Sequence, residues 1–439
     1  MYSYDEVMTF VEEEDVKFIR LAFCDVHGRQ KNVSIMPSEL KRAFNEGISF
    51  DASAVTGFGD VVRSDLFLHP DPSTLSVLPW RPSNGRVVRM FCDIKYPDGT
   101  RFEKDGRYIL KQAVEKAKEM GISCFFGAEF EFYLFNLDDN GSPTGETFDK
   151  AGYMDIAPDD KGENVRREIC FNLLEMGISP ESSHHEEGPG QNEIDFKYSG
   201  ALSAADNAVT FKSVVQTIAR RNGLYADFSP KPLMHESGNG LHINVSVKSE
   251  SGKDLSDSFM AGILEHITEM TVFLNPVKES YKRLGEKKAP KYVTWSHENR
   301  SQLIRIPAVK NAANKRIELR SPDPCANPYI AYALIIYAGL DGIKRGLNRK
   351  IACVYLGSAV KELHSDISER HARYGFKLML AAENTKFLVY HFMSAHIARH
   401  LIHGIFKNLG ITQSERYRLV GAYPHSEKSH NLLSETHYK

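Results

Sequence analysis

Two acidic side chains flank a break in the chain near the middle of the sequence. Residues 184–198 read His-His-Glu-Glu-Gly-Pro-Gly-Gln-Asn-Glu-Ile-Asp-Phe-Lys-Tyr. The Gly-Pro-Gly run predicts a turn between the arms of a hairpin, which would place Glu186 and Glu193 on facing arms. Carboxylates that face each other at short range favour a bound cation, because like charges repel. The segment therefore indicates a cation site built on a hairpin.

Three further segments alternate polar and apolar residues, which is typical of a strand with one polar and one apolar face. They are Gly-Ala-Glu-Phe-Glu-Phe-Tyr-Leu-Phe (127–135), Gly-Leu-His-Ile-Asn-Val-Ser-Val (240–247) and Arg-Ile-Glu-Leu-Arg (316–320). On their polar faces they carry Glu129 and Glu131, then His242, Asn244 and Ser246, and finally Arg316, Glu318 and Arg320. Together with the hairpin, these strands predict a curved sheet whose concave face is a charged cavity.

Five glutamates would share this cavity, and they could not all stay ionised together without strong repulsion. A divalent metal removes the conflict. A ligand set of carboxylates with a single imidazole favours Mg²⁺ or Mn²⁺ over structural Zn²⁺, which is typically held by cysteines. One Glu-X-Glu pattern on its own is usually a solvated strand face, but four such segments in one chain favour a metal centre.

Arginines follow the acidic segments closely. Arg300, Arg305, Arg316 and Arg320 lie within about twenty residues of one another, and the planar guanidinium offers a fork of donors suited to carboxylate and phosphate oxygens. Carboxylates, metal ions and arginines in one cavity predict phosphoryl transfer. A glycosidase with paired carboxylates is an alternative from the glutamates alone, but it leaves the arginines and His242 unexplained.

Taken together, these motifs resemble the bacterial type I glutamine synthetase family. The resemblance is carried by His-His-Glu…Gly-Gln-Asn-Glu, Gly-Ala-Glu-Phe-Glu-Phe, Lys-Pro-Leu…Gly-Asn-Gly-Leu-His-Ile-Asn-Val-Ser, Asn-Arg-Ser…Ile-Arg-Ile-Pro and Arg-Ile-Glu-Leu-Arg-Ser-Pro-Asp-Pro…Asn-Pro-Tyr. In the order of the family, it covers about residues 15–345. It implies an α+β fold with a small N-terminal β-grasp domain, residues 13–98, and a larger C-terminal catalytic domain, residues 104–439. The catalytic domain would hold a curved antiparallel sheet with flanking helices.

The resemblance also implies an activity, that of an ATP-dependent ligase that forms a γ-glutamyl amide from L-glutamate and ammonia. The γ-carboxylate of glutamate would attack the γ-phosphate of ATP, and ammonia would displace phosphate from the γ-glutamyl phosphate. Two or more Mg²⁺ or Mn²⁺ ions per site and a dodecamer of two hexameric rings are implied as well. The expected partners are small molecules: ATP, glutamate, and ammonia or an amine.

Position by position, the resemblance implies roles for residues of this chain. The metal ligands nearer glutamate and the amine would be Glu131, Glu186 and Glu193, and those on the nucleotide phosphates would be Glu129, His242 and Glu318. Glutamate would be bound by Gly238, Arg283, Arg300 and Arg320, and ATP by Glu181, Tyr198, Asn244, Val245, Ser246, Arg305 and Arg316. The catalytic positions would be Asp51, Arg300 and the flap position, Lys288. In the family, the loop that carries the equivalent of Asp51 reaches into a neighbouring subunit, where its aspartate helps deprotonate ammonium.

Two positions near the amine depart from the family's pattern. The flap reads Lys-Arg-Leu-Gly-Glu-Lys-Lys-Ala-Pro, one residue shorter than usual, with Lys288 where the family has a proton-accepting glutamate. A cation there would repel ammonium, and Glu286 is a candidate substitute. Ser237 replaces an asparagine that contacts glutamate. Two acceptors therefore stay open: ammonia, which the retained Asp51 favours, and an organic primary amine or polyamine.

A rival of another class is a non-catalytic member of the family that keeps the ring assembly as a binding or regulatory protein. The intact set of metal ligands favours the enzyme. No Tyr-Asp-Leu-Pro-Pro segment is present, so the adenylylation site of one family subtype is not expected. Beyond about residue 345 the resemblance fades, and the chain is expected to form helices.

Composition sets the remaining limits. With 55 basic and 57 acidic residues, no net charge indicates nucleic acid or an anionic membrane as a partner. The six cysteines are scattered without a Cys-X-X-Cys pair, which predicts buried free thiols in a reducing compartment. The N-terminal residues lack the basic and apolar regions of a signal peptide, and no run approaches the length of a membrane span. The expected location is the cytoplasm.

Overall fold

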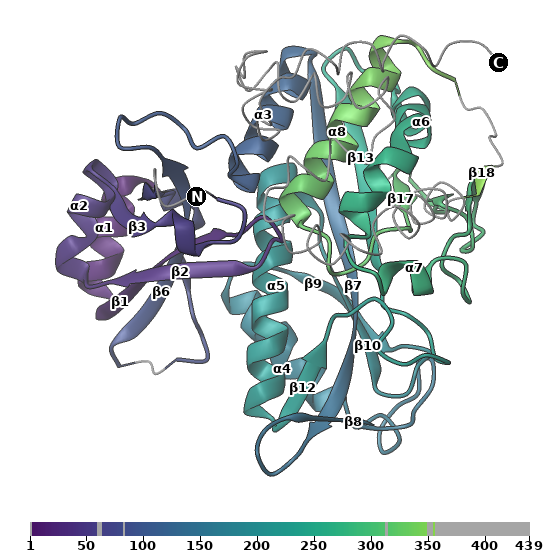
Figure 1. Ribbon diagram of the computed structural model, residues 1–439, viewed down its shortest axis with the longest axis horizontal. Helices are drawn as coiled ribbons and strands as arrows, with labels where there is room; N and C mark the ends of the chain where they lie inside the picture. Colours follow the sequence, from purple (N-terminus) through teal and green to yellow (C-terminus); the bar gives the residue numbers. More distant parts are fainter. Residues whose placement is uncertain (1, 59–63, 82–83, 312–314, 349–353, 356–439) are drawn as a thin grey trace, which may run out of the picture. The chain divides into compact units, whose positions relative to one another are not determined.

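The N-terminal domain is a mixed sheet flanked by short helices (Figure 1). The computed structural model describes residues 2–58, 64–81, 84–311, 315–348 and 354–355. In this domain the strand order is β2-β1-β6-β4-β3, with β5 beside β6, and β1 pairs with β6 in parallel. The strands are β1 (Val16–Cys24), β2 (Gln30–Ile35), β3 (Ile48–Asp51), β4 (Asp65–Pro70), β5 (Ser76–Val77) and β6 (Arg86–Lys95).

The helices of this domain begin at residue types that favour a helix start. A capping box between Ser3 and Glu6 starts α1 (Tyr4–Glu13), because the Ser3 hydroxyl accepts a hydrogen bond from the Glu6 amide. Pro37 opens the short η1 (Pro37–Glu39), and α2 (Leu40–Asn45) follows directly. Two further 3₁₀ turns are η2 (Ala52–Ala54) and η4 (Pro72–Thr74). The predicted β-grasp domain is confirmed.

The larger domain is built on a curled sheet with β7 at its centre. The strand order is β15-β16-β17-β13-β7-β10-β9, and β8, β11 and β12 also pair with β7. Its strands are β7 (Ile122–Leu137), β8 (Pro143–Thr147), β9 (Pro180–His185), β10 (Gln191–Phe196), β11 (Ser199–Gly200), β12 (Leu224–Asp227), β13 (Leu241–Ser249), β15 (Trp295–His297), β16 (Ile304–Ile306) and β17 (Ile317–Leu319). All described pairs in this sheet are antiparallel except β15 and β16 at its edge. A separate pair is formed by β14 (Tyr292–Val293) and β18 (Val354–Tyr355).

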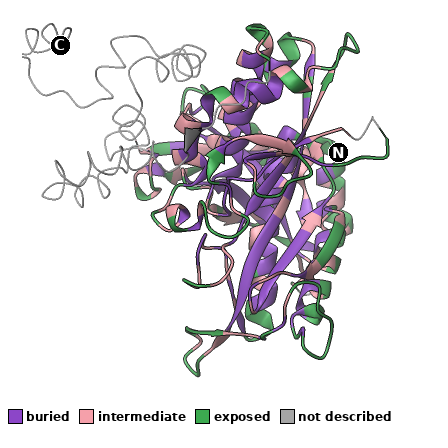
Figure 2. Ribbon diagram, turned by 90° about the vertical axis from the view of Figure 1, so that its right-hand side faces the viewer, coloured by how far each residue is buried: buried purple, intermediate pink, exposed green. Residues whose placement is uncertain are grey.

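Helices pack against the apolar face of this sheet. They are α3 (Gly106–Glu119), α4 (Glu163–Glu175), α5 (Ala201–Arg221), α6 (Ser256–Leu274) and α8 (Pro328–Lys344). The short α7 (Ser280–Arg283) instead ends at Arg283, which lies on the polar side of the sheet. Phe130 and Phe132 of β7 are fully buried, and the Phe130 ring stacks on Phe211 of α5 with 5.1 Å between the centroids. Figure 2 shows the buried strands at the centre of the structure and the exposed residues mainly in outer loops and helix faces. Because side chains alternate along β7, burying the phenylalanines turns the polar residues toward the opposite face.

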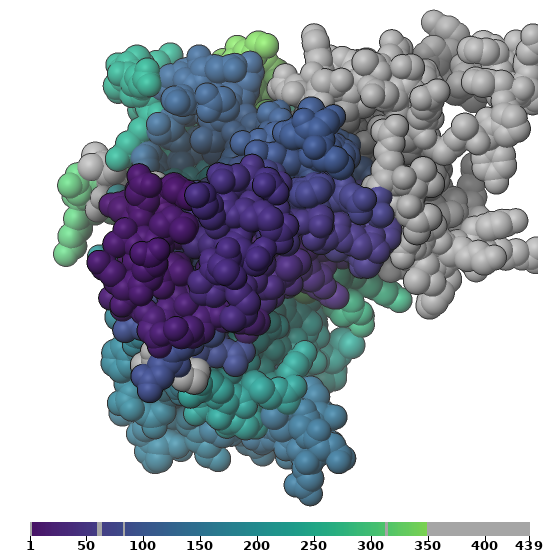
Figure 3. All heavy atoms as spheres, turned by 90° about the vertical axis from the view of Figure 1, so that its left-hand side faces the viewer, coloured from purple at the N-terminus to yellow at the C-terminus, as the bar shows by residue number. Residues whose placement is uncertain are grey.

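Buried polar contacts join the two domains. The Arg107 guanidinium, at the start of α3, lies 2.9 Å from Asp71, 3.3 Å from Asp93 and 3.0 Å from Asp206, so one arginine ties α5 to the N-terminal sheet. Gly28, between β1 and β2, has a φ of +73°, and an added Cβ would lie 2.9 Å from the Cα of Asn327. In the space-filling view of Figure 3, the N-terminal domain forms one continuous surface in front of the larger domain.

The predicted helices of the catalytic domain are confirmed as far as residue 345. The helices expected beyond that point, and Cys353, lie outside the described residues. Of the other cysteines, all five carry free thiols, and Cys24, Cys92 and Cys124 are buried. No helix in the described part of the chain is long and apolar enough to cross a membrane.

Candidate active site

The predicted hairpin is formed by β9 and β10. Glu193 lies opposite His184 in the strand register, and the Glu186 amide donates to the Gln191 carbonyl at 2.8 Å. The turn needs Gly190, whose φ is +69° and where a Cβ would lie 2.9 Å from the Leu134 carbonyl oxygen. The Gly-Pro-Gly run therefore sets the register that brings these acidic side chains together.

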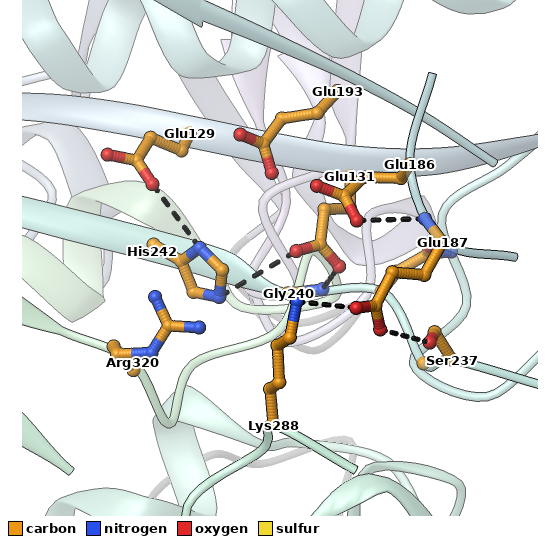
Figure 4. A network of polar contacts seen from close by, with 12 residues as sticks. Glu129, Glu131, Glu186, Glu187, Glu193, Ser237, Gly240, His242, Lys288 and Arg320 are labelled. Carbon is orange, nitrogen blue, oxygen red and sulfur yellow. Dashed lines mark hydrogen bonds and ion pairs between the residues drawn. The ribbon is translucent and has the colours of Figure 1, made fainter. Parts of the chain in front are cut away.

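The strand registers on either side of β7 assemble the rest of the site. In the antiparallel pair with β10, Glu131 lies opposite Glu193, and in the pair with β13, Glu129 lies opposite His242. His242 Nδ1 lies 3.3 Å from a Glu129 carboxylate oxygen, and its Nε2 lies 3.8 Å from Glu131 (Figure 4). Glu318 of β17 completes this side, with a carboxylate oxygen 4.0 Å from His242 Nδ1.

The pKa values of these groups indicate a cluster in which a bound cation would be stabilised. Burial, followed by the charge of Glu186, raises the pKa of Glu131 to about 7. Burial and then the neighbouring Asp195 hold the pKa of Glu193 well above its ordinary value. Burial and the charge of Arg320 lower the pKa of His242 well below its ordinary value, so the imidazole is neutral and free to act as a ligand.

The donor set fits hard divalent ions. Five groups of His, Asp and Glu in the described part of the chain hold ligand atoms within 4.8 Å of one another, and three of them contain only the expected ligands and His184: Glu129, His242 and Glu318; Glu131, Glu193 and His242; and His184, Glu186 and Glu193. The first is the set expected on the nucleotide phosphates. The three ligands expected nearer the amine are divided between the other two groups, which share Glu193. Oxygen ligands with one or two imidazoles are the chemistry that Mg²⁺ and Mn²⁺ prefer.

Five of these ligands line one cavity, called here the acidic cavity: Glu129, Glu131, Glu186, Glu193 and His242. Its lining is Glu129, Glu131, Tyr153, Glu186, Glu187, Gln191, Glu193, Ser237, Gly238, His242, Arg283, Glu286, Lys287, Lys288, Ala289, Arg300 and Arg320. All four residues expected to bind glutamate are in this set. Arg283 is buried, and its guanidinium donates to the backbone carbonyls of Ser321 at 2.8 Å and Arg320 at 3.2 Å, which fixes its orientation.

Several residues expected to contact ATP lie beside the acidic cavity. The Asn244 amide donates to Glu129 at 2.7 Å, and Arg316 Nε donates to the Asn244 oxygen at 3.0 Å. Arg305 and Arg320 both donate to Glu318, which is completely buried. One polar chain therefore runs from the metal ligands along β13, β16 and β17.

The other residues expected to contact ATP do not line the acidic cavity. Tyr198 is 61% exposed and lies against Gly127, next to Asn244, while Glu181 is exposed on β9. The side chain of Val245 is buried in the core, so only its backbone is available to a ligand. Ser246, one residue on, is half-buried on the polar face of β13.

Asp51 does not line the acidic cavity of its own chain. It is exposed at the end of β3, and its carboxylate accepts hydrogen bonds from the Ser53 amide and hydroxyl, at 2.9 Å and 2.6 Å. That local contact is what turn composition alone predicts for an aspartate followed by a serine two residues on. The role expected in a neighbouring subunit stays a prediction.

Outside the flap, four lining or ligand residues were not singled out from the sequence: Tyr153, His184, Glu187 and Gln191. His184 Nε2 lies 3.1 Å from Glu186, and Gln191 Nε2 donates to Glu131 at 3.3 Å. Tyr153 belongs to an irregular segment with no periodicity to reveal it. The buried pair of His185 Nε2 and Asp149, 2.8 Å apart, ties that segment to the hairpin.

Comparison with known proteins identifies the family of the chain. The family model described as the glutamine synthetase catalytic domain matches residues 103–365, and the model of the glutamine synthetase β-grasp domain matches residues 15–97. The chain belongs to the glutamine synthetase family. Among its relatives in that family, the glutamine synthetase of Clostridium saccharobutylicum is 46% identical over 359 residues, which cover 79% of this chain and 81% of the relative. The glutamine synthetase of Methanosarcina mazei is 46% identical over 357 residues, 78% of this chain and 80% of the relative.

Solved structures agree with the family. The Plasmodium falciparum glutamine synthetase is 28% identical, with a TM-score of 0.72 over 79% of this chain and 76% of that chain. The GmaS/ADP complex is also 28% identical, with a TM-score of 0.73 over 91% of this chain and 99% of that chain. The predicted fold and the predicted activity are confirmed by these relatives: the chain is an ATP-dependent carbon–nitrogen ligase of the glutamine synthetase type.

Proposed function

We propose that ammonia is joined to the γ-carboxylate of L-glutamate in the acidic cavity, with cleavage of ATP to ADP and phosphate. The residues named below would bind the substrates and ions and catalyse this reaction. The proposal depends on one observation: the neutral imidazole of His242 is shared by two clusters of potential metal ligands, one with Glu129 and Glu318 and the other with Glu131 and Glu193. Two neighbouring groups of hard ligands suit two divalent ions, and an ATP-dependent transfer needs metal charge beside the phosphates.

Two or more Mg²⁺ or Mn²⁺ ions would be held by the carboxylates and His242. The ligands proposed on the nucleotide side are Glu129, His242 and Glu318, and those on the amine side are Glu131, Glu186 and Glu193. When bound, the ions supply positive charge that neutralises the triphosphate and the transferred phosphoryl group. The raised pKa values of Glu131 and Glu193 support this assignment, because burial and neighbouring carboxylates outweigh the positive charge that the protein supplies to them.

Glutamate would be held by Arg283, Arg300, Arg320 and the backbone at Gly238. Arg283 is anchored by backbone carbonyls and still lines the acidic cavity, so a remaining part of its donor fork faces a substrate carboxylate. Arg320 lies between Glu318 and the cavity, and Arg300 is exposed at its rim. We assign these two arginines to the charge that develops while the phosphoryl group moves from ATP to the γ-carboxylate.

ATP would lie along the polar chain that leaves the acidic cavity. Asn244, Arg305 and Arg316 lie on this chain, with the backbone at Val245, Ser246, Tyr198 and Glu181 farther out. Tyr198 is exposed, and its ring, edge-on to the Phe125 ring with 6.2 Å between the centroids, offers an apolar surface to a base.

Three broader assignments rest on the family. The enzyme would act as a dodecamer of two hexameric rings, in which Asp51 reaches the acidic cavity of a neighbouring subunit; its exposure at the end of β3 is compatible with this. A cytoplasmic location is supported by the five free thiols. Domain bounds of 13–98 and 104–439 are supported by the turn at Gly99, whose amide donates to the Tyr96 carbonyl at 2.9 Å.

The test is to follow phosphate and glutamine together. Purified protein with Mg²⁺, ATP, glutamate and ammonium should release one phosphate for each glutamine formed, and Glu193→Gln should lower the rate by about 10²-fold or more. A panel of primary amines and polyamines belongs in the same assay. Turnover with an organic amine but none with ammonium would refute the glutamine-forming reaction, and no ATP turnover with any acceptor would refute the enzyme.

A further inference from the structure

A fully buried histidine lies directly behind Glu186. Side chains alternate between the two faces of a strand, so His184 of β9 lies on the side of the acidic cavity, 3.1 Å from Glu186, and His185 points to the opposite face. His185 Nδ1 lies 2.7 Å from the backbone carbonyl oxygen of Glu186, and its Nε2 lies 2.8 Å from a carboxylate oxygen of Asp149. A carbonyl oxygen and an ionised carboxylate can only accept hydrogen bonds, so both ring nitrogens carry a hydrogen and the ring is an imidazolium.

Five buried side chains behind the hairpin form one polar layer, called here the brace: Asp149, Asp160, Arg166, His185 and Asn192. Arg166 of α4 donates to both oxygens of Asp160, at 2.5 Å and 3.1 Å, and to the side-chain oxygen of Asn192 at 2.6 Å. Ligand atoms of Asp149, Asp160 and His185 lie within 4.8 Å of one another, as they would around a metal ion. An imidazolium has no lone pair for an ion, however, and the two cations of the brace already balance its two carboxylates.

The brace holds the backbone at both ends of the hairpin turn. Asn192 of β10 lies opposite His185 in the strand register, and its side-chain nitrogen donates to the Gly190 carbonyl at 2.9 Å. The Gly190 amide donates to Asp149 at 2.9 Å. At the other end of the turn, the His185 ring donates to the carbonyl of Glu186. The backbone from which the Glu186 side chain enters the acidic cavity is therefore fixed from behind.

From this geometry we infer that His185 is a positioning residue, whose bond to the Glu186 carbonyl aims the Glu186 carboxylate at the amine-side ion. The nucleotide-side ligands lie on other strands, outside the brace: Glu129, His242 and Glu318. Loss of this bond should therefore weaken one ion and spare the other. The inference rests on the metal assignment in the proposed function, because Glu186 is a ligand of the amine-side ion there.

Two substitutions separate the two bonds of the imidazole. The side-chain nitrogen of glutamine can take the place of Nε2 in histidine, and that of asparagine can take the place of Nδ1. His185→Gln therefore keeps a donor to Asp149 and loses the donor to Glu186, whereas His185→Asn keeps the donor to Glu186 and loses the donor to Asp149. Both remove the same positive charge, so the two variants control for each other.

The measurement is Mn²⁺ affinity by electron paramagnetic resonance, first without nucleotide and then with a saturating non-hydrolysable ATP analogue. The amine-side ion is the one that should bind without nucleotide, because its proposed ligands are all protein side chains. His185→Gln should raise the Kd of this ion by about 10- to 100-fold, the range for losing a partner that orients a metal ligand. The Kd of the analogue should change by less than about twofold. His185→Asn should keep the Kd of the ion within about threefold of wild type, although its Tm falls.

A control for general destabilisation is His266→Asn. His266 is a second buried histidine, with Nε2 2.8 Å from Asp341, and it joins α6 to α8 without lining the acidic cavity. Its replacement should lower the Tm and leave the Kd of both ions within about twofold of wild type.

Equal weakening of the ion in both His185 variants would assign His185 to folding alone and refute the positioning role. A His185→Gln variant that binds the ion as tightly as wild type, or that does not fold, would refute it too. Wild-type protein that binds no Mn²⁺ would refute both the metal assignment and the positioning role. If wild type binds Mn²⁺ but forms no glutamine, the proposed reaction fails, and the Kd values of the two His185 variants still decide the role of His185.

Discussion

Replacing Glu131 by glutamine removes a negative charge from the acidic cavity without removing a hydrogen bond. The Gly240 amide at 2.7 Å and Gln191 Nε2 at 3.3 Å both donate to the same Glu131 oxygen, Oε2. A glutamine carbonyl oxygen in that place accepts both bonds. The other oxygen lies 3.8 Å from His242 Nε2, so the new NH₂ group meets a neutral imidazole. The substitution therefore isolates the effect of the charge.

The size of that effect follows from the pKa of Glu131, which is about 7 instead of the ordinary 4.5. A carboxyl group with a raised pKa in the folded state favours folding below its unfolded pKa, and this contribution is lost as the pH rises through 7. Each pKa unit corresponds to about 1.4 kcal/mol, so the ionised Glu131 costs the metal-free protein about 3 kcal/mol at pH 8. Glu131→Gln should raise the free energy of unfolding by up to that amount at pH 8 and by almost nothing near pH 4.5.

Urea unfolding of wild type and variant, at equal protein concentration and with a chelator present, measures this difference. The matched control is Glu187→Gln, because the hydrogen bond from Lys288 lowers the pKa of Glu187 and its neutralisation should destabilise the protein slightly. With Mn²⁺ at saturation the order should reverse, since the ion stabilises the wild-type site. A Glu131→Gln variant that is less stable than wild type at pH 8 without metal would refute the electrostatic reasoning.

Three more predictions concern the metal, the substrate and the fold. Burial raises the pKa of Glu131 to about 7 and holds the pKa of Glu193 well above its ordinary value, so protons compete with the ion and the rise in Tm caused by Mg²⁺ should be larger at pH 8 than at pH 6; a pH-independent rise would contradict this. Arg283→Lys should raise the KM for glutamate by about tenfold or more with the affinity for ATP retained, because lysine cannot donate a fork; an unchanged KM contradicts the assignment. Arg107→Met leaves three aspartates without their buried partner and should lower the free energy of unfolding by about 3–5 kcal/mol, measured by urea; a loss below about 1 kcal/mol would show that the domains do not depend on it.

The parts of the site that follow local periodicity could be predicted from the sequence. Alternation along β7 fixed the side on which Glu129 and Glu131 lie, because Phe130 and Phe132 have to be buried. The Gly-Pro-Gly turn fixed the register of the hairpin that carries Glu193. In each case the information lies within about ten residues, which is the range over which a strand or a turn constrains its own side chains.

Contacts between distant segments could not be predicted in the same way. Tyr153 reaches the acidic cavity from an irregular segment that the buried pair of Asp149 and His185 holds in place, and no repeat of residue types marks it. The ion pair of Lys288 and Glu187 joins two turns whose sequences carry no common pattern. The sequence alone shows that Lys288 replaces the family's glutamate in the flap. The partner of Lys288, however, is set by tertiary packing.

The most direct test of this account is to count the ions. Manganese bound to wild-type protein can be followed by the loss of the free Mn²⁺ signal in electron paramagnetic resonance, in the presence of a non-hydrolysable ATP analogue. We expect at least two ions per chain, and weaker binding of both in His242→Ala, because this imidazole belongs to both ligand groups. A wild-type protein that binds no Mn²⁺, or a His242→Ala variant that binds both ions as tightly as wild type, would refute a two-metal site.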